Sequence, residues 1–326
     1  MNKWRLGAFL LGLTVLAVLT VYSGAGGVLK ALETLSLVGF VIVVLMHLPT
    51  VLLLGAAWWF VGAEATGARP REFLVARIVR DAAAEVLPFS QVGGFVFGIR
   101  TLVLRGVGAA RAAASMFVDL IVEFWAKIPY IVAGLWALLS FRRDTPLSRI
   151  MLIALLIALV AGSLPIVLRG RPWAGIVRLI ARYAARWPEL AAVSQSVDDT
   201  LGQILSRRSR LVLGFALHIL LWFFGAAETW VILTLMGTRT SGTTALVIDS
   251  FVSALRTFTF LVPAAAGVQE ASYVLSGALC GISPSTSLAL SLTRRARDIV
   301  LGVPALMTWQ ILEARADRHR DGAATS

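Results

Sequence analysis

The sequence predicts an all-α polytopic membrane protein, with about six transmembrane helices and two re-entrant hairpins arranged as an inverted repeat. Three observations support this prediction: an apolar composition, two hydrophobic segments interrupted by Gly and Pro, and an uneven distribution of Lys and Arg between loops. Hydrophobic residues make up 58% of the 326 residues and charged residues 15%, and the mean hydropathy is +0.82. A large soluble helical protein would instead show amphipathic helices without long uncharged runs.

Transmembrane helices are expected where an apolar run reaches the roughly 20 residues needed to cross the hydrocarbon core. The predicted spans are 6–29, 35–62, 112–140, 149–168, 210–236 and 286–312. The first run follows Lys3 and Arg5 and ends in small residues, which is also the pattern of a cleavable signal peptide. Because this run is long for a signal peptide and further spans follow at once, we favour a retained helix.

The two interrupted segments, 86–106 and 261–282, lie between predicted spans. A shift of the sequence by 175 positions aligns Pro88 with Pro263, Gly106 with Gly281, Glu123 with Asp298 and Pro129 with Pro304. Non-helical backbone is tolerated at membrane depth only where it is buried in protein or faces water. We therefore predict that both segments are re-entrant hairpins, with full spans as the alternative.

Lys and Arg residues gather in alternate loops. With a cytoplasmic N-terminus, the outside loops hold Lys30, Arg142, Arg143, Arg149 and Arg239. Many more basic residues fall in the inside segments, where we count Arg77 and Arg80. By the positive-inside rule, both termini are then cytoplasmic, in a multi-pass protein of the bacterial inner membrane. The units 35–140 and 210–312 become inverted copies, with one hairpin opening to each side.

We expect a single transmembrane domain over residues 1–313. The cytoplasmic linker 169–209 carries apolar residues on one helical face and Arg at every fourth position on the other. This pattern is typical of a surface helix that faces lipid phosphates, and equally of a solvated helix packed on the protein. The charged segment 314–326 is expected to be a disordered cytoplasmic tail.

Charged residues at membrane depth are costly and therefore mark candidate sites. Asp119 and Glu123 lie four residues apart on one face of a predicted span. Arg294, Arg297 and Asp298 interrupt another, and the 175-residue shift aligns Asp119 with Arg294. We predict that Asp119 and Glu123 lie close to Arg294 or Arg297. The polar core so formed is interpreted as a hydrophilic groove for a lipid headgroup, or as an ion-pair network that joins the two halves.

The hairpins and their arms supply further candidates for this groove and its gating. In the first hairpin these are Glu85, Pro88, Gln91, Gly93, Gly94 and Arg100. In the second they are Arg256, Pro263, Gly267, Gln269 and Glu270. Glycines permit tight turns and close backbone approach, and helix ends present free N–H and C=O groups. We expect Gln269 and Glu270 to be functional, and the alternative for Glu270 is a buried carboxylate bonded to the partner hairpin.

Three further polar residues lie near these segments. Asp249 shares a helical face with Arg256 in the arm before the second hairpin. Glu228 is a weaker candidate, expected to form local hydrogen bonds near the outer interface. His218 is interpreted as a core residue or an interhelical hydrogen-bond partner.

Composition argues against several other functions. The single cysteine, Cys280, excludes an intrachain disulfide, and with three scattered histidines it forms no recognisable metal-ligand spacing. We therefore expect no metal or cofactor. The net charge of +12 lies mainly in loops, so membrane topology explains it and no nucleic-acid partner is expected.

The motif LPF-x-QVGG followed by G-x-R, from Leu87, resembles the transmembrane region of lysylphosphatidylglycerol synthase/flippase proteins. The motif VP-x₃-GVQE-A-x-Y, from Val262, with the later LALSL-x-RRARD, does so as well. The resemblance covers nearly the whole chain. Among family members, the chain is similar to the single-domain, hopanoid-biosynthesis-associated (HpnL-like) proteins. One departure is Ala264-Ala265-Ala266, where family members often carry Gly.

The resemblance implies a protein with re-entrant hairpins that moves, or helps to move, a lipid between leaflets. The aminoacyl transferase domain of two-part members has no counterpart in this sequence, so we expect no enzyme activity. The expected cargo is an amphiphilic lipid such as a hopanoid or a phospholipid. Arg100, Arg294 and Arg297 would face its headgroup, and Glu123, Glu270 and Asp298 would gate it or couple it to protons.

Two alternatives remain at this point. In the first alternative, the protein is a non-transporting accessory or scaffold subunit of a lipid (hopanoid) biosynthesis pathway, with biosynthetic enzymes as partners. Less favoured is an intramembrane lipid-modifying enzyme, because the sequence shows no nucleophile–His arrangement.

Overall fold

The computed structural model contains helices and short connections, with no strand among the residues that it describes. These are residues 24–87, 90–141, 148–150, 152–153, 156–157, 197–258 and 267–324. The predicted spans 6–29 and 149–168 lie largely outside them, as do Pro88, Pro263 and most of the linker 169–209. Within the described part of the chain, the prediction of an all-α protein is confirmed.

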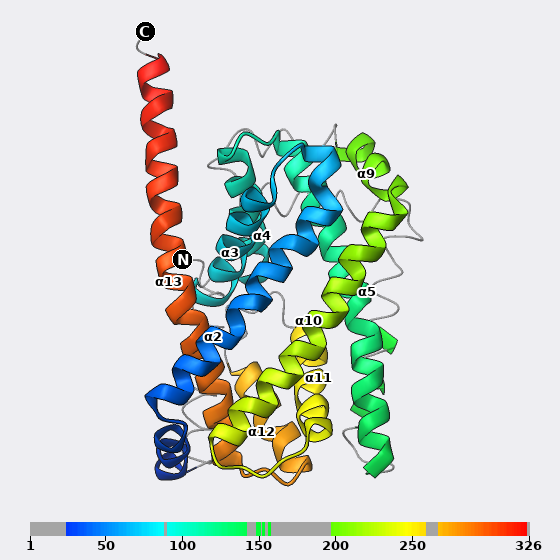
Figure 1. The fold of residues 1–326 in the computed structure, drawn as a ribbon, viewed down its shortest axis with the longest axis vertical. Coiled ribbons are helices and arrows are strands. Elements are labelled where there is room, and N and C mark those ends of the chain that lie inside the picture. The colour runs from blue at the N-terminus through cyan, green and yellow to red at the C-terminus, as the bar shows by residue number, and fades with distance from the viewer. Residues whose placement is uncertain are drawn as a thin grey trace, which may run out of the picture.

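The order long helix, helical hairpin, long helix occurs twice. The first set consists of α2 (Ala25–Thr66), α3 (Pro70–Val86), α4 (Ser90–Leu104) and α5 (Ala109–Phe141). The short helix α9 (Val197–Ser206) precedes the second set: α10 (Arg208–Leu235), α11 (Gly242–Phe258), α12 (Val268–Leu279) and α13 (Pro284–Ala324). Figure 1 shows the α3–α4 hairpin in the half of the molecule toward which α13 extends, and the α11–α12 hairpin in the opposite half.

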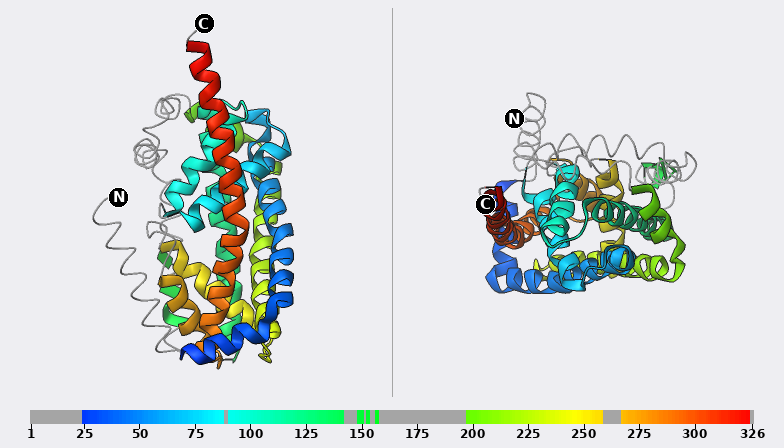
Figure 2. Two further views of the ribbon diagram at one scale, coloured as in Figure 1. Left: turned by 90° about the vertical axis from the view of Figure 1, so that its left-hand side faces the viewer. Right: turned by 90° about the horizontal axis from the view of Figure 1, so that it is seen from above.

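The long helices connect the two halves. The helices α2 and α10 pack side by side, and α5 and α13 pack against the hairpins. Of the described helices, α2 and α10 are long and apolar enough to cross a membrane. The helix α2 changes direction at Ser36, whose φ of 60° is non-helical. Its first part lies across one end of the molecule, and the rest follows the long axis (Figure 2).

Many large hydrophobic side chains point outward from the long helices. Leu37 of α2 is 77% exposed and Trp136 of α5 is 73% exposed, and similar residues line α10 and α13. A soluble monomer rarely exposes apolar surface of this extent. The outer surface is therefore suited to lipid, while the polar residues described below point inward.

The hairpins end in the same turn at positions 175 residues apart. After α4, Gly106 has a φ of 89° and the amide of Val107 donates to the carbonyl of Leu102 over 3.1 Å. After α12, Gly281 has a φ of 79° and Ile282 donates to Gly277 over 2.8 Å. The next helices, α5 and α13, also begin 175 positions apart. These are glycine C-caps of the Schellman type, and their match extends the repeat to backbone geometry.

We expect that both capping positions require glycine, because other residues rarely adopt a positive φ. Among the described residues, nothing lies within 4 Å of a Cβ built on Gly106 or Gly281, so Gly→Ala tests conformation without a clash. We expect a loss of about 1 kcal/mol in the free energy of unfolding for each variant. The measurement is unfolding of the purified protein in detergent. The control Gly202→Ala, in open space on helix α9, should be neutral or stabilising. A loss at Gly202 equal to that at Gly106 would contradict this explanation.

Two boundaries differ from the predictions. The first hairpin is longer than 86–106, because its first arm is α3, whose polar residues made it look like a loop. The segment 314–326 is not a disordered tail as far as Ala324, because α13 continues to that residue. Ala, Glu and Arg are strong helix formers, which explains why the helix extends through them.

Candidate functional site

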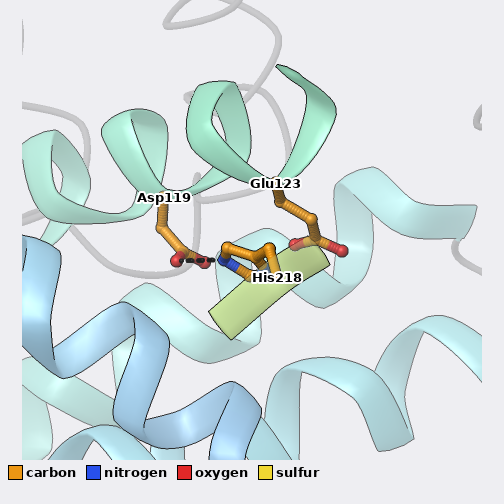
Figure 3. Close-up of side chains that lie close together, drawn as sticks. All are labelled: Asp119, Glu123 and His218. Carbon is orange, nitrogen blue, oxygen red and sulfur yellow. Dashed lines mark hydrogen bonds and ion pairs between the residues drawn. The ribbon is translucent and has the colours of Figure 1, made fainter. Parts of the chain in front are cut away.

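Five side chains from three helices form a buried group that we call the Asp119 cluster: Arg77, Arg80, Asp119, Glu123 and His218. Arg80 donates to Asp119 Oδ2 over 3.1 Å and to Glu123 Oε2 over 2.9 Å. Arg77 Nη1 donates to the same Glu123 oxygen over 3.1 Å. His218 Nε2 lies 3.1 Å from Asp119 Oδ1. Figure 3 shows Asp119 and Glu123 pointing from α5 toward His218 of α10.

Helical spacing brings these residues together. Arg77 and Arg80 are three residues apart on α3, and Asp119 and Glu123 are four apart on α5, so each pair shares a helical face. Asp119 is fully buried, and Arg77, Arg80 and His218 are almost so. Buried charges are tolerated only when they are paired and hydrogen-bonded. The cluster therefore fixes the α3–α4 hairpin to α5 and α10.

The predicted partners of Asp119 and Glu123 are wrong. The structure pairs these carboxylates with Arg77 and Arg80 of α3, whereas we expected Arg294 or Arg297. The two α3 arginines had been assigned to an inside loop. They lie instead in the first arm of the hairpin, which directly precedes α5 in the chain. Because this hairpin packs beside α5, its arginines are the cations nearest to Asp119. The prediction that His218 forms an interhelical hydrogen bond is confirmed.

Arg294 belongs to a second group, which we call the Asp249 cluster: Tyr130, Thr229, Asp249 and Arg294. Arg294 Nη1 lies 2.8 Å from Asp249 Oδ1. Tyr130 donates to Asp249 Oδ2 over 2.6 Å, and Thr229 donates to Oδ1 over 2.9 Å. Arg294 also donates to the backbone carbonyl of Gly225 over 2.6 Å. This cluster ties α11 to α5, α10 and α13.

Glu228 forms a third contact between distant helices. It accepts a hydrogen bond from Arg297 of α13 and lies 3.1 Å from Nδ1 of His47 on α2. Arg297 also donates to Asp298 over 2.6 Å. Glu228 is 2% exposed, and its partners lie on other helices. The prediction of local hydrogen bonding near the outer interface is therefore wrong. It links α2, α10 and α13 through one carboxylate.

The two larger clusters share one position of the repeat, which carries opposite charge in the two halves. In the first, arginines of the hairpin arm α3 bind Asp119 of α5. In the second, Asp249 of the hairpin arm α11 binds Arg294 of α13. Asp119 and Arg294 are the residues that the 175-residue shift aligns. Each hairpin is thus held to its following long helix by an ion pair, and the polarity is reversed between the two.

The hairpins also contact each other. Arg256 of α11 donates to Glu85 of α3. Close by, Lys127 of α5 lies 3.3 Å from Thr257 of α11 and 4.6 Å from the ring centre of Trp222 on α10. The side chains of Arg256 and Glu85 are 30% and 23% exposed. This hairpin-to-hairpin contact is therefore more accessible than the two clusters.

Three of the remaining predicted residues bind the hairpins to α13. Glu270 accepts from the amide of Gly267 over 2.8 Å and from Arg295 over 2.9 Å. It therefore caps its own helix and binds α13, which differs from the predicted bond to the partner hairpin. Gln269 lies 3.5 Å from Ser291 Oγ, and Arg100 donates to Glu313 over 2.8 Å.

Glycine in the first hairpin serves close packing. A Cβ on Gly94 would lie 2.6 Å from the carbonyl oxygen of Arg80. Small residues at such contacts let helix backbones approach within a membrane. Gly93 occupies the same helix α4, and the side chain of Gln91 lies outside the described residues. Gly94 thus keeps α4 against α3 at the position of the Asp119 cluster.

Three side chains of the Asp119 cluster are of the types that bind metal ions. Asp119, Glu123 and His218 each offer an atom within 4.8 Å of the others. The same carboxylates already accept from the guanidinium groups of Arg77 and Arg80. A divalent cation there would lie beside two positive charges and compete with both. These residues fit an ion-pair network and do not fit a divalent metal.

Sequence reasoning missed Arg77, Arg80, Tyr130, Thr229 and His47 as members of the buried network. The signal for Arg77 and Arg80 was present: two arginines on one helical face, directly before an interrupted apolar segment. Tyr130 and Thr229 carry no sequence signal, because both residue types are common in membrane helices. His47 had been considered only as a metal ligand.

The outward apolar surface and the inward charged clusters define an integral membrane protein. The chain belongs to the family described as "Lysylphosphatidylglycerol synthase TM region", which matches residues 9–305. Comparison with curated proteins and with solved structures found no match. The predicted family is therefore confirmed, together with a membrane location and a role related to membrane lipids. The HpnL-like subtype stays a prediction.

Proposed function

We propose that this protein is a lipid translocase that moves an amphiphilic lipid between the leaflets of the bacterial inner membrane. The observation that carries the proposal is the pair of helical hairpins, one from each half of the chain, that touch through Glu85 and Arg256. Each hairpin is also bound to a long helix by buried charges. Broken apolar segments in corresponding positions of two halves are the usual location of a transporter's substrate site.

The charges lie where a polar headgroup would need partners. An ionisable residue inside a membrane domain is expensive and marks a functional site by default. Several members of the network are only partly buried: the side chains of Glu123, Arg294 and Asp298 are 19%, 13% and 16% exposed. A headgroup can exchange with such a partner without leaving either charge unpaired. This favours a hopanoid or phospholipid with a polar head as cargo.

In the proposed mechanism, the hairpins are re-entrant and open to opposite sides of the membrane, and both termini are cytoplasmic. Separation of Glu85 from Arg256 opens a polar path between the hairpins. The headgroup passes along the charged residues while its tails stay in lipid. The long helices α2, α5, α10 and α13 form the frame against which the hairpins rock.

The test is lipid exchange between leaflets in liposomes that contain the purified protein. We expect labelled phospholipid or hopanoid to exchange faster than in protein-free liposomes. Asp298→Asn should slow exchange by about tenfold, since loss of one charged partner costs about 1–3 kcal/mol. The control is Asp81→Asn, which removes a more exposed acid that binds Arg77 within the same helix. Equal rates for the two variants would argue against a role of Asp298.

The same experiment separates the other two functions. A protein that exchanges no lipid but co-purifies with a lipid-modifying enzyme is an accessory subunit, and the full burial of Asp119 is compatible with such a closed core. A chemically altered lipid in the liposomes would identify an intramembrane enzyme. Either result would overturn the proposal of translocation.

A further inference from the structure

We propose that His218 is a proton-binding site, and that its protonation releases the α3–α4 hairpin from α5. This adds a ligand, the proton, to the network described above. The inference rests on the proposed function only where it links release of the hairpin to lipid transport. The release itself is a property of the Asp119 cluster.

Within the described part of the chain, one ring nitrogen of His218 has a hydrogen-bond partner and the other has none. Nε2 lies 3.1 Å from Asp119 Oδ1, and the residue is 1% exposed. An ionised carboxylate is only an acceptor, so Nε2 carries the hydrogen and donates. Nδ1 is buried and has no hydrogen-bond partner among the residues that the structure describes. In the neutral ring it is an unused acceptor, which is an uncommon state for a buried polar atom. The ring is thus oriented to take up a proton at Nδ1.

Within the five residues of the Asp119 cluster, the formal charges balance while His218 is neutral, and Asp81, which also contacts both arginines, is 38% exposed and lies outside this buried group. Arg77 and Arg80 provide two positive charges, and Asp119 and Glu123 provide two negative charges at distances of 2.9–3.4 Å. A proton on His218 adds a third positive charge at the same two carboxylates. Excess buried charge is costly, so one cation must move away. The imidazolium and the α3 arginines therefore compete for Asp119.

Of the three helices in the cluster, α3 is the one that belongs to a hairpin, and it also packs against α2 and α13. His218 lies within α10 and Asp119 within α5, both of which are long helices of the frame. Arg77 and Arg80 belong to the first arm of a hairpin. Its other outward links include the partly exposed bond from Glu85 to Arg256. Release of the two arginines would free the charged face of α3, so that protonation favours a separated hairpin.

Other charged groups near the cluster are already paired. On α3 and α5 these are Asp81, bound to Arg77, and Lys127, near Glu123 and the ring of Trp222. On α2 they are His47, bound to Glu228, and Glu64, bound to Arg210 of α10. On α11 and α13 they are Asp249 with Arg294, Arg256 with Glu85, and Arg297 with Glu228. His218 shares its carboxylate with the hairpin arginines, whereas His47 does not. His47 is therefore the matched control.

The experiment measures hydrogen exchange of the α3–α4 amides in the purified protein between about pH 5 and pH 8, where histidine titrates. Exchange rates are corrected for the intrinsic effect of pH on amides. Because the docked hairpin binds one proton fewer, its opening constant should rise as pH falls, by up to about tenfold per pH unit. His218→Gln should remove this response, and His47→Gln should keep it. His218→Lys, with a permanent charge, should show the open level throughout.

Two results would overturn the inference. One is a wild-type hairpin whose corrected exchange does not change with pH, a result that needs no variant to fold. The other is a pH response that persists unchanged in His218→Gln. Failure of the proposed function looks different, because the hairpin would respond to pH through His218 while liposomes show no lipid exchange.

Discussion

Asp119→Asn is expected to lower the free energy of unfolding by about 3–5 kcal/mol, the cost of removing one partner of a buried ion pair. The carboxylate is fully buried and accepts from Arg77, Arg80 and His218. With Asn in its place, the acids left beside the two guanidinium groups among the described residues are Glu123 and Asp81, whose side chains are 19% and 38% exposed. The fully buried acid is lost and the remaining acids are more exposed, so the loss combines missing hydrogen bonds with weaker compensation of two buried cations.

The matched control is Asp81→Asn. Asp81 binds the same arginine, Arg77, over 2.8 Å, but its side chain is 38% exposed and lies four residues away on the same helix. Such a pair contributes about 0.3–0.5 kcal/mol. Unfolding in detergent, followed by circular dichroism, should separate the two variants by several kcal/mol. Similar losses for both would mean that Asp119 is not the centre of a buried network.

Much of the fold could be predicted, because the length of the apolar runs indicates the long helices and the positions of Gly and Pro indicate the interruptions between them. The predicted span 112–140 corresponds to α5, Ala109–Phe141, and 210–236 to α10, Arg208–Leu235. The shift of 175 positions, which pairs Gly106 with Gly281 in the sequence, also pairs their positive φ angles and the starts of α5 and α13. These features are local or periodic, so one sequence is enough to reveal them.

The partners of the buried charges could not be predicted in the same way. Helix α3 carries Arg77, Arg80 and Asp81 within seventeen residues, a composition typical of a loop or a surface helix. Only its packing between α4 and α13 shows that the arginines are buried. Asp119 and Glu123 were recognised as buried charges, but the choice between α3 and α13 as their partner depends on tertiary contacts.

The second large effect concerns the contact between the hairpins. If lipid passes between them, Glu85 of α3 and Arg256 of α11 must separate in each cycle. A covalent link between these positions is therefore expected to reduce leaflet exchange to the protein-free rate. Both side chains are partly exposed, so thiol reagents can reach cysteines placed there. The natural cysteine, Cys280, is replaced by Ser to leave a single reactive pair.

The central claim is tested most directly by lipid exchange in liposomes containing the Glu85→Cys/Arg256→Cys variant, before and after reaction with a reducible bifunctional thiol reagent. The unreacted variant gives the reference rate, and each single-cysteine variant treated with the reagent controls for labelling alone. We predict that cross-linking stops protein-dependent exchange and that reduction restores it. Exchange at the reference rate in the fully cross-linked protein would contradict translocation between the hairpins.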